Sequence, residues 1–198
     1  MAEQSEHSSA GLGLCALFAL VTIVVVIKLG TDLDQMQFSV QSAGASSLPV
    51  GEKAPEFALQ NLDGNEVSLA DYQGRVVLVD FWATWCGPCL QELPHIQRLH
   101  EQFQDQGLTI LAVSTDQNKG AVPPFVAKNG YTFPVLYADE GIEGAYGIQG
   151  IPTVYLIDRK GAIRFHHVGF GPGGEEELEH EVKALLGEEE ERSGTSPG

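Results

Sequence analysis

The sequence contains few cysteines and few basic residues. Three cysteines are too few for a scaffold held by several disulfides, and only Cys86 and Cys89 are close enough in sequence to pair locally. Eleven lysines and arginines stand against 27 aspartates and glutamates, which gives a formal net charge of −16. This charge disfavours nucleic acid and anionic lipid surfaces as partners.

One long segment contains no charged residue. It runs from Ser8 to Ile27 and includes the apolar stretch GLGLCALFALVTIVVVI. About 20 apolar residues, at a rise of 1.5 Å each, match the ~30 Å hydrocarbon core of a bilayer. The preceding MAEQSEHSSA has no lysine or arginine, so it lacks the basic start of a cleaved signal peptide. The segment therefore predicts a membrane-spanning helix, in which Cys15 is an ordinary apolar residue.

Differences in amino-acid composition divide the rest of the chain into a linker, a globular domain and a C-terminal tail. The residues after the apolar segment are polar and small, without an apolar period, which is typical of a tether. The C-terminal sequence EEEERSGTSPG is a solvated, low-complexity end. The expected organisation is an N-terminal tail at 1–10, a transmembrane helix at 11–29, a linker at 30–47, a globular domain at 48–187 and an acidic tail at 188–198.

Hydrophobic patterns predict the first half of the globular domain. Residues 57–69 form two short runs around Asp-Gly-Asn, which indicates a hairpin. Residues 75–83 and 108–115 are nearly continuous apolar runs, typical of strands buried on both faces. A helical stripe between them ends at Gly107 and completes a βαβ unit. Its apolar residues are Leu90, Leu93, Ile96, Leu99 and Phe103.

The sequence of the second half of the globular domain predicts a mixed arrangement of strands and helices. The expected elements are a helix at 123–130, a strand at 133–137, an antiparallel hairpin at 153–158 and 162–169, and a helix at 174–187. The last helix has glutamates in its first turn, which suits the helix dipole, and Gly187 is expected to cap its C-terminus. The order predicts an α/β fold with a central mixed sheet and helices on both faces.

The stretch TWCGPCLQELP at 84–94 places Cys86 between a predicted buried strand and the start of a helix. Backbone amides and the helix dipole stabilise a thiolate at such a position. Cys89 lies one helical turn further along the same face, within reach of the Cys86 sulfur. Pro88 enters the first turn, where its missing N–H costs nothing. We expect Cys86 to be an exposed nucleophile and Cys89 a shielded resolving cysteine.

Such a pair binds a metal, staples a fold or carries electrons. A zinc site needs two further ligands, and His95 and His100 are five residues apart on a helix, so they point in different directions. His166 and His167 are neighbours on a strand and face opposite sides, so they cannot chelate together. A structural disulfide across two residues adds little, because loop-closure entropy grows with loop length. The pattern favours redox exchange, and we expect no metal.

Two motifs resemble the thioredoxin superfamily. VDFWATWCGPC at 79–89 is similar to its active-site strand and turn, and GIPTVYLID at 150–158 to its cis-proline loop and following strand. Together, in this order and about 65 residues apart, they are specific, whereas Cys-X-X-Cys alone is not. The resemblance is more specific to the TlpA/ResA-like branch of extracytoplasmic thiol-disulfide oxidoreductases. The features that point to this branch are the CLQELP sequence, the leading hairpin, the membrane anchor and an insert at about 116–146. The implied fold is thioredoxin-like.

The resemblance implies roles for individual residues. Cys86 would attack the target disulfide and Cys89 would resolve the mixed disulfide. Asp80 corresponds to a buried acid that exchanges a proton with the resolving thiol, and burial in an apolar strand raises a carboxyl pKa. Glu92 corresponds to an acidic residue near the dithiol. Each acid also has a simpler interpretation. Asp80 is then an aspartate bonded to a nearby backbone group, and Glu92 is a favourable charge early in a helix.

Further residues would contact the substrate. Pro152 would be cis and face the disulfide, and backbone groups of Ile151 would pair with an extended substrate strand. Trp85 and Trp82 either shape the surface beside the sulfurs or pack in the core. The expected substrate-binding residues are Trp85, Gly87, Pro88 and Ile151.

The resemblance implies an enzyme that reduces protein disulfides without a cofactor. Its partners would be protein thiols and disulfides, apocytochrome c among them, and a membrane electron donor of the CcdA/DsbD type. Gly-Pro also separates the cysteines of thioredoxin, whose potential of about −270 mV is reducing. Lys28 alone would favour a cytoplasmic domain. A cytosolic thioredoxin needs no anchor, however, so we expect the domain on the periplasmic side.

Three other functions are compatible with a dithiol. A disulfide-forming oxidant would require a strongly stabilised Cys86 thiolate. A peroxidase would resemble the peroxiredoxins, which carry proline and threonine where this chain has Val79 and Ala83. A non-catalytic metallochaperone would hold copper(I), an ion that soft thiolates suit.

Overall fold

The computed structural model describes residues 48–188 of this chain. The predicted membrane span at 11–29, the linker at 30–47 and all but the first residue of the predicted acidic tail lie outside the described residues. Between residues 48 and 188, none of the helices has the length and apolar character that crossing a bilayer requires.

The strands and helices follow one another in the order that the sequence predicts, with one additional short helix, at Ile142–Ala145, that was not predicted. The strands are β1 (Ala58–Gln60), β2 (Glu66–Ser68), β3 (Val76–Trp82), β4 (Leu108–Ser114), β5 (Val135–Tyr137), β6 (Thr153–Ile157) and β7 (Ile163–Val168). The α-helices are α2 (Gly87–Phe103), α3 (Val122–Asn129), α4 (Ile142–Ala145) and α5 (Gly174–Gly187).

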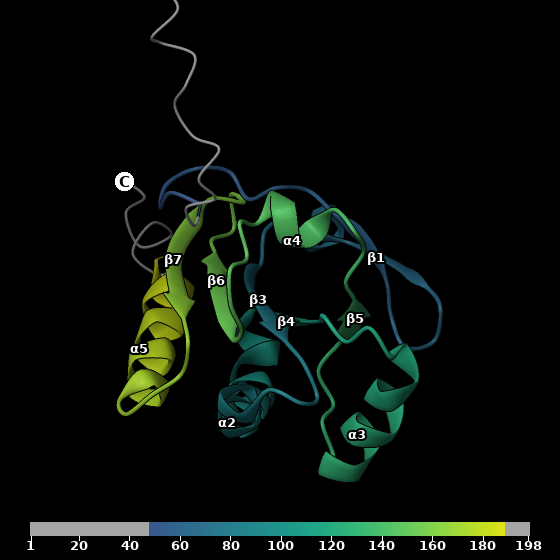
Figure 1. Ribbon diagram of the computed structural model, residues 1–198. Coiled ribbons are helices and arrows are strands. Elements are labelled where there is room, and N and C mark those ends of the chain that lie inside the picture. The colour runs from purple at the N-terminus through teal and green to yellow at the C-terminus, as the bar shows by residue number, and fades with distance from the viewer. Residues whose placement is uncertain (1–47, 189–198) are drawn as a thin grey trace, which may run out of the picture. The chain divides into compact units, whose positions relative to one another are not determined.

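A five-stranded mixed sheet forms the centre of the fold, with the strand order β5-β4-β3-β6-β7 (Figure 1). The strands β3, β4 and β5 are parallel, whereas β6 pairs antiparallel with both β3 and β7. Every residue of β3 and β4 is buried. Strands covered on both faces read as continuous apolar runs, and for this reason both were recognisable in the sequence.

Successive side chains of β3 point to opposite faces of the sheet and enter two separate cores. Val77, Val79 and Phe81 belong to the core that is covered by residues 54–69, which include β1 and β2, and by α4. Leu78 and Trp82 belong to the core closed by α2, α3 and α5. Figure 1 shows these three helices below the sheet and α4 above it. The expected thioredoxin-like arrangement with helices on both faces is therefore present, although α4 is a single turn.

The N-terminal hairpin also agrees with the sequence pattern. The strands β1 and β2 pair antiparallel, with Leu59 opposite Val67. The turn is held by Asn61, whose Oδ1 accepts hydrogen bonds from the amides of Asp63 and Asn65 at 3.0 and 2.9 Å. Such local side-chain bonds are the reason Asn and Asp mark turns.

Two local predictions are wrong. Leu90 was expected in the apolar stripe of α2 but is 38% exposed, because the buried face of the helix begins one residue earlier, at the fully buried Cys89, and continues at Leu93. Gly187 does not follow α5 as a cap. It lies in the last turn of the helix, and Glu188 is the C-cap residue.

Candidate active site

Cys86 and Cys89 form a disulfide at the N-terminus of α2, with their Cα atoms 5.3 Å apart. Cys86 is the N-cap residue in an extended conformation, and its Sγ accepts a hydrogen bond from the Cys89 amide at 3.2 Å. Cys86 is 4% exposed and Cys89 is fully buried. Cys86 is therefore less exposed than the sequence predicted, although it remains the more accessible of the two cysteines.

The two residues between the cysteines form the first positions of α2. Gly87 and Pro88 are both exposed, and apart from the neighbouring residues and the backbone of the same helix turn, no described heavy atom lies within 4 Å of the position that a Cβ of Gly87 would occupy. Pro88 lies in the first turn, as predicted, where the helix requires no amide hydrogen from it. The surface beside the disulfide is therefore open to an approaching chain.

The loop that leads from β3 to Cys86 is anchored by an aspartate from a different strand. Asp116, which follows β4, is buried and accepts hydrogen bonds from the Thr84 amide at 2.9 Å and the Thr84 hydroxyl at 2.6 Å. The hydroxyl of Ser114 donates to the same carboxylate at 2.9 Å. Hydrogen bonds to an ionised acceptor are among the stronger ones in proteins, so Asp116 fixes the backbone two residues before Cys86.

Asp80 is fully buried in the middle of β3. The strand alternation places its side chain on the same face as Leu78 and Trp82, which is the face covered by α2. Neither carboxylate oxygen has a hydrogen-bond partner among the described residues. The simpler interpretation, in which Asp80 is bonded to a nearby backbone group, is therefore wrong for the described part of the chain. Burial raises the pKa of Asp80 to about 7, because an apolar environment disfavours the charged form.

Glu92 is the second buried acid, one helical turn after Cys89 on α2 and only 3% exposed. Its Oε2 has no hydrogen-bond partner in the described part of the chain. Burial, and then the charge of Asp80, raise the pKa of Glu92 to about 9. Glu92 is therefore not a solvated charge near a helix N-terminus, which was its simpler interpretation.

The two acids can hold and release protons close to the dithiol. Neighbouring carboxyl groups that interact strongly release their protons in steps that belong to the pair. With the pKa of Asp80 raised to about 7 and that of Glu92 to about 9, the pair retains protons at the pH values where thiol chemistry operates. A group with a pKa near the working pH is an effective general acid or base, so the arrangement can accept the proton that a thiol loses.

The predicted proline loop lies at the same end of the sheet as the disulfide. The Ile151–Pro152 peptide bond is cis, as expected. The residue after it, Thr153, begins β6 and pairs with Phe81 near the end of β3 that leads to Cys86. Pro152 is buried and Ile151 is half-buried. The structure thus brings together the two motifs that are far apart in the sequence.

The two tryptophans have different environments. Trp82 is fully buried in the core under α2 and α3, with its ring 5.5 Å from that of Phe125. Trp85 is 70% exposed and directly precedes Cys86. Of the two interpretations left open by the sequence, Trp82 therefore packs in the core and Trp85 forms surface beside the sulfurs.

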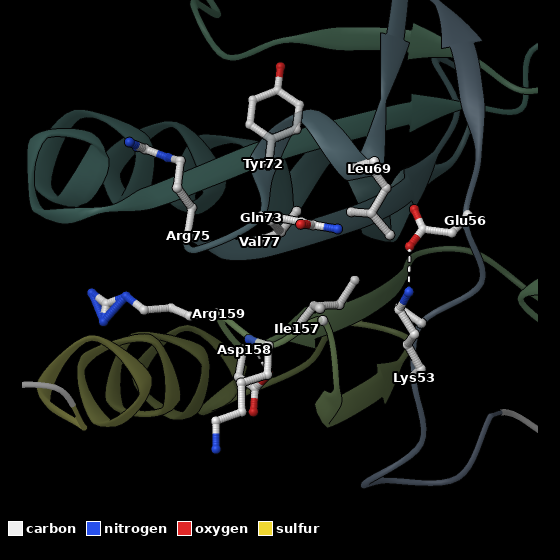
Figure 2. A pocket seen from close by; sticks show the side chains of 14 residues that line it. Lys53, Glu56, Leu69, Tyr72, Gln73, Arg75, Val77, Ile157, Asp158 and Arg159 are labelled. Atoms are coloured by element: carbon white, nitrogen blue, oxygen red, sulfur yellow. Dashed lines mark hydrogen bonds and ion pairs between the residues drawn. The ribbon is translucent and has the colours of Figure 1, made fainter. Parts of the chain in front are cut away.

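A small cavity of about 30 Å³ lies at the opposite end of the sheet from the disulfide (Figure 2). Its lining includes Arg75 before β3 and Ile157 at the end of β6. Lys53 forms an ion pair with Glu56 at 3.0 Å, and Arg75 donates hydrogen bonds to three oxygen atoms around the start of β4. No predicted site residue lines this cavity, so it is not part of the candidate active site.

Sequence reasoning missed the pairing of Asp116 with Thr84, and also an ion pair of 2.7 Å between His167 and Glu181. The sequence does contain a signal for the pairing of Asp116 with Thr84. Thr84 and Asp116 follow the carboxyl ends of two neighbouring parallel strands, and polar side chains at this edge of an open sheet commonly serve a site. For the second, the sequence offers no comparable signal, because it depends on how α5 docks.

Comparisons with known proteins agree with this geometry. Residues 50–166 match the model of the AhpC/TSA family. The thiol-disulfide oxidoreductase ResA of Geobacillus thermodenitrificans is 36% identical over 146 residues, which cover 73% of this chain and 82% of the relative. The thioredoxin-like protein YneN of Bacillus subtilis is 36% identical over 156 residues, which cover 77% and 89%.

Solved structures give the same result. A crystal structure from Chlorobium tepidum, described as a thiol:disulfide interchange protein DsbE, matches with a TM-score of 0.68 and 41% identity. The match covers 71% of this chain and all of that one. The chain belongs to the AhpC/TSA family and is a thioredoxin-like thiol-disulfide oxidoreductase of the ResA type with a Cys86–Cys89 pair.

Proposed function

We propose that this oxidoreductase is tethered to a membrane and reduces protein disulfides outside the cytoplasm. The observation that carries the proposal is the position of the Cys86–Cys89 pair. It caps a helix N-terminus, where a thiolate is stabilised, and two buried acids with raised pKa values lie on the same side of the sheet.

The reaction is a two-step thiol-disulfide exchange. In the reduced enzyme, the Cys86 thiolate attacks one sulfur of the substrate disulfide. The substrate S–S bond breaks, a mixed disulfide with Cys86 forms, and the first substrate sulfur leaves as a thiolate. The Cys89 thiolate then attacks the Cys86 Sγ, which releases the second substrate sulfur as a thiolate. The substrate gains two electrons, and the enzyme is left with the Cys86–Cys89 disulfide.

The buried acids manage the protons of the second step. Cys89 has no access to water in the oxidised form, so its proton needs an acceptor inside the protein. Glu92 lies one turn further along α2, and Asp80 lies on the sheet face beneath that helix. An ionised carboxyl of this pair takes the proton from Cys89 and returns it when the enzyme is reduced again.

The substrate segment binds between Trp85 and the proline loop. Gly87 and Pro88 are exposed beside the disulfide, and Trp85 offers a large apolar surface next to them. Backbone groups of Ile151 pair with an extended substrate, in the manner of strand addition. An unfolded or extended polypeptide that carries a disulfide fits this surface best.

The tether and the partners come from the sequence. The apolar segment at 11–29, in which Lys28 is the single charged residue, has the length of a bilayer span, and an anchored reductant is useful where cytosolic thioredoxin is absent. We propose apocytochrome c as a substrate, because the sequence resembles the TlpA/ResA-like branch, whose members often reduce its haem-site cysteines. A membrane carrier of the CcdA/DsbD type would return two electrons to the Cys86–Cys89 disulfide.

The deciding measurement is the reduction potential of the Cys86–Cys89 couple, equilibrated against glutathione or dithiothreitol buffers. We expect a value near or below about −250 mV, in the range of reductants. A value near about −120 mV is typical of enzymes that make disulfides, and it would reverse the proposed direction of electron flow.

A second experiment tests the topology. Whole cells are treated with a membrane-impermeant thiol reagent after reduction, in a Cys15→Ser background, so that Cys86 and Cys89 are the remaining thiols. We expect labelling in intact cells, and none in a matched Cys86→Ser/Cys89→Ser variant. Labelling that requires lysis would place the domain in the cytoplasm.

A further inference from the structure

Three side chains with metal-binding atoms meet between β7 and α5. His167 Nε2 lies 2.7 Å from an Oε2 atom of Glu181. With a carboxylate oxygen of Glu177, the three ligand atoms all lie within 4.8 Å of one another. Imidazole nitrogen and carboxylate oxygen are common ligands of divalent transition metals.

The fold explains why these residues converge. Glu177 and Glu181 are four residues apart on α5, so they lie one above the other on the same face of the helix. His167 is opposite Val154 in the sheet, and Val154 is opposite Asp80. His167 therefore points to the same face as Asp80, towards the helices, while His166 points to the other face and packs against Tyr155, with the two rings tilted relative to one another.

The charges of this cluster are incompletely balanced. Glu177 and Glu181 carry like charges one helical turn apart, an arrangement that destabilises a helix. Glu181 is only 8% exposed, so water screens its charge poorly. His167 neutralises at most one of the two carboxylates, and the nearby cation Lys183 forms its ion pair with Glu179. A bound cation would relieve the repulsion.

A separate observation points to a ligand at this place. A cavity of about 230 Å³ is lined by His167, by Glu177 and by Glu92 of α2. The Glu92 carboxyl is 3% exposed, and its Oε2 has no hydrogen-bond partner in the described residues. A buried polar atom without a partner, on a residue that lines a cavity, calls for an explanation, and an ion with its water ligands supplies one.

We propose that His167, Glu177 and Glu181 bind a divalent transition metal ion of the Zn²⁺ class. Zinc bonds of about 2.0–2.2 Å to such ligands place tetrahedral ligand atoms roughly 3.4 Å apart. The short His167–Glu181 hydrogen bond therefore opens slightly, and His167 binds through Nε2 with its proton on Nδ1. The nitrogen ligand favours Zn²⁺ over Mg²⁺ and Ca²⁺, which prefer oxygen. The fourth position faces the cavity and holds water.

This site is distinct from the dithiol and does not depend on the direction of electron flow. It does share the cavity that Glu92 lines, so a bound cation would favour the ionised form of that acid.

The test uses the full chain without a polyhistidine tag, in a Cys15→Ser background and freed of metal by a chelator. The protein is kept oxidised, because thiols of Cys86 and Cys89 would themselves bind the ion. Co²⁺ is titrated as the probe, since its visible absorption reports a tetrahedral site, and Zn²⁺ is then added in competition. We expect one Co²⁺ per chain with tetrahedral absorption, displaced by Zn²⁺.

Matched variants assign the ligands. His167→Gln and Glu177→Gln should each weaken Co²⁺ binding by at least about tenfold, as loss of a metal contact does. Glu177 is exposed, so its replacement leaves the fold intact. The controls His180→Gln and Glu176→Gln change exposed residues of the same helix and should leave affinity unchanged. Absence of tetrahedral absorption, or binding that both His167→Gln and Glu177→Gln leave unchanged, would overturn the proposal.

Discussion

Asp116 holds Thr84 by two hydrogen bonds, from the Thr84 amide at 2.9 Å and from its hydroxyl at 2.6 Å. The two residues are 32 positions apart in the sequence but follow neighbouring parallel strands. Because Thr84 precedes Cys86 by two residues, this contact ties the position of the redox loop to β4. The reactive cysteine is therefore positioned by the sheet as well as by its helix.

We predict that Asp116→Ala lowers the free energy of unfolding by about 1–3 kcal/mol, because it leaves buried donors without an acceptor. It should also slow the reduction of insulin, since the loop before Cys86 loses its anchor. Urea unfolding and a turbidity assay on a fragment of residues 48–188 measure the two effects. The control Asp105→Ala removes an exposed carboxylate and should change stability by less than about 0.5 kcal/mol. Equal behaviour of the two variants would contradict the anchoring role.

The buried acids predict a pH dependence of stability. Burial raises the pKa of Glu92 from 4.5 to about 9, so the native state keeps a proton that the unfolded chain has already lost. The native state then binds more protons than the unfolded state, and stability falls as pH rises between about 4.5 and about 9. Below this window, both states are protonated and Glu92 causes no loss.

Glu92→Gln removes this contribution, because the amide does not titrate. We expect the difference in unfolding free energy, variant minus oxidised wild type, to increase as pH rises, by up to about 1.4 kcal/mol per pH unit. Urea unfolding at several pH values within the window measures the difference. The exposed control Glu140→Gln should follow the wild type. A constant difference between Glu92→Gln and wild type would mean that Glu92 is ionised throughout.

The two tryptophans should respond differently to truncation. Trp82→Ala empties a fully buried position and should cost about 3–5 kcal/mol in unfolding free energy. Trp85→Ala changes an exposed side chain and should alter stability by less than about 0.5 kcal/mol. We expect Trp85→Ala to slow reduction of protein disulfides more than reduction of a small aromatic disulfide, since only a protein is large enough to use that surface. Equal slowing of both would argue against a docking role.

The two cysteines should give different trapped species. In Cys89→Ser, the second exchange step cannot occur, so the mixed disulfide between Cys86 and a substrate accumulates. In Cys86→Ser, we expect little adduct, because Cys89 is fully buried. Non-reducing electrophoresis followed by mass spectrometry detects the adducts, with Cys15→Ser in both backgrounds. Predominant trapping by Cys86→Ser would exchange the two assigned roles.

Apart from the single-turn helix α4, the sequence was sufficient to predict the order of the helices and main strands and the two motifs at the site. Continuous apolar runs identified β3 and β4, because a strand covered on both faces has no polar side. The position of the cysteines between a strand and a helix followed from the same local patterns. These features depend on neighbours along the chain, so they can be read without knowing the fold.

Other features followed from tertiary structure alone. The sequence could not decide which of Trp82 and Trp85 is buried, because both flank the end of one strand. It also placed Leu90 on the wrong side of α2, since several neighbouring apolar residues allow more than one helical phase and docking on the sheet selects one of them.

The pairing of Asp116 with Thr84 and the meeting of His167 with Glu177 and Glu181 join segments that are distant in sequence. The first depends on the register of β3 with β4, and the second on how α5 packs over β7. Local periodicity carries information about which face of an element is buried. It does not specify which polar groups meet across that buried face, because that is determined when the elements pack against one another.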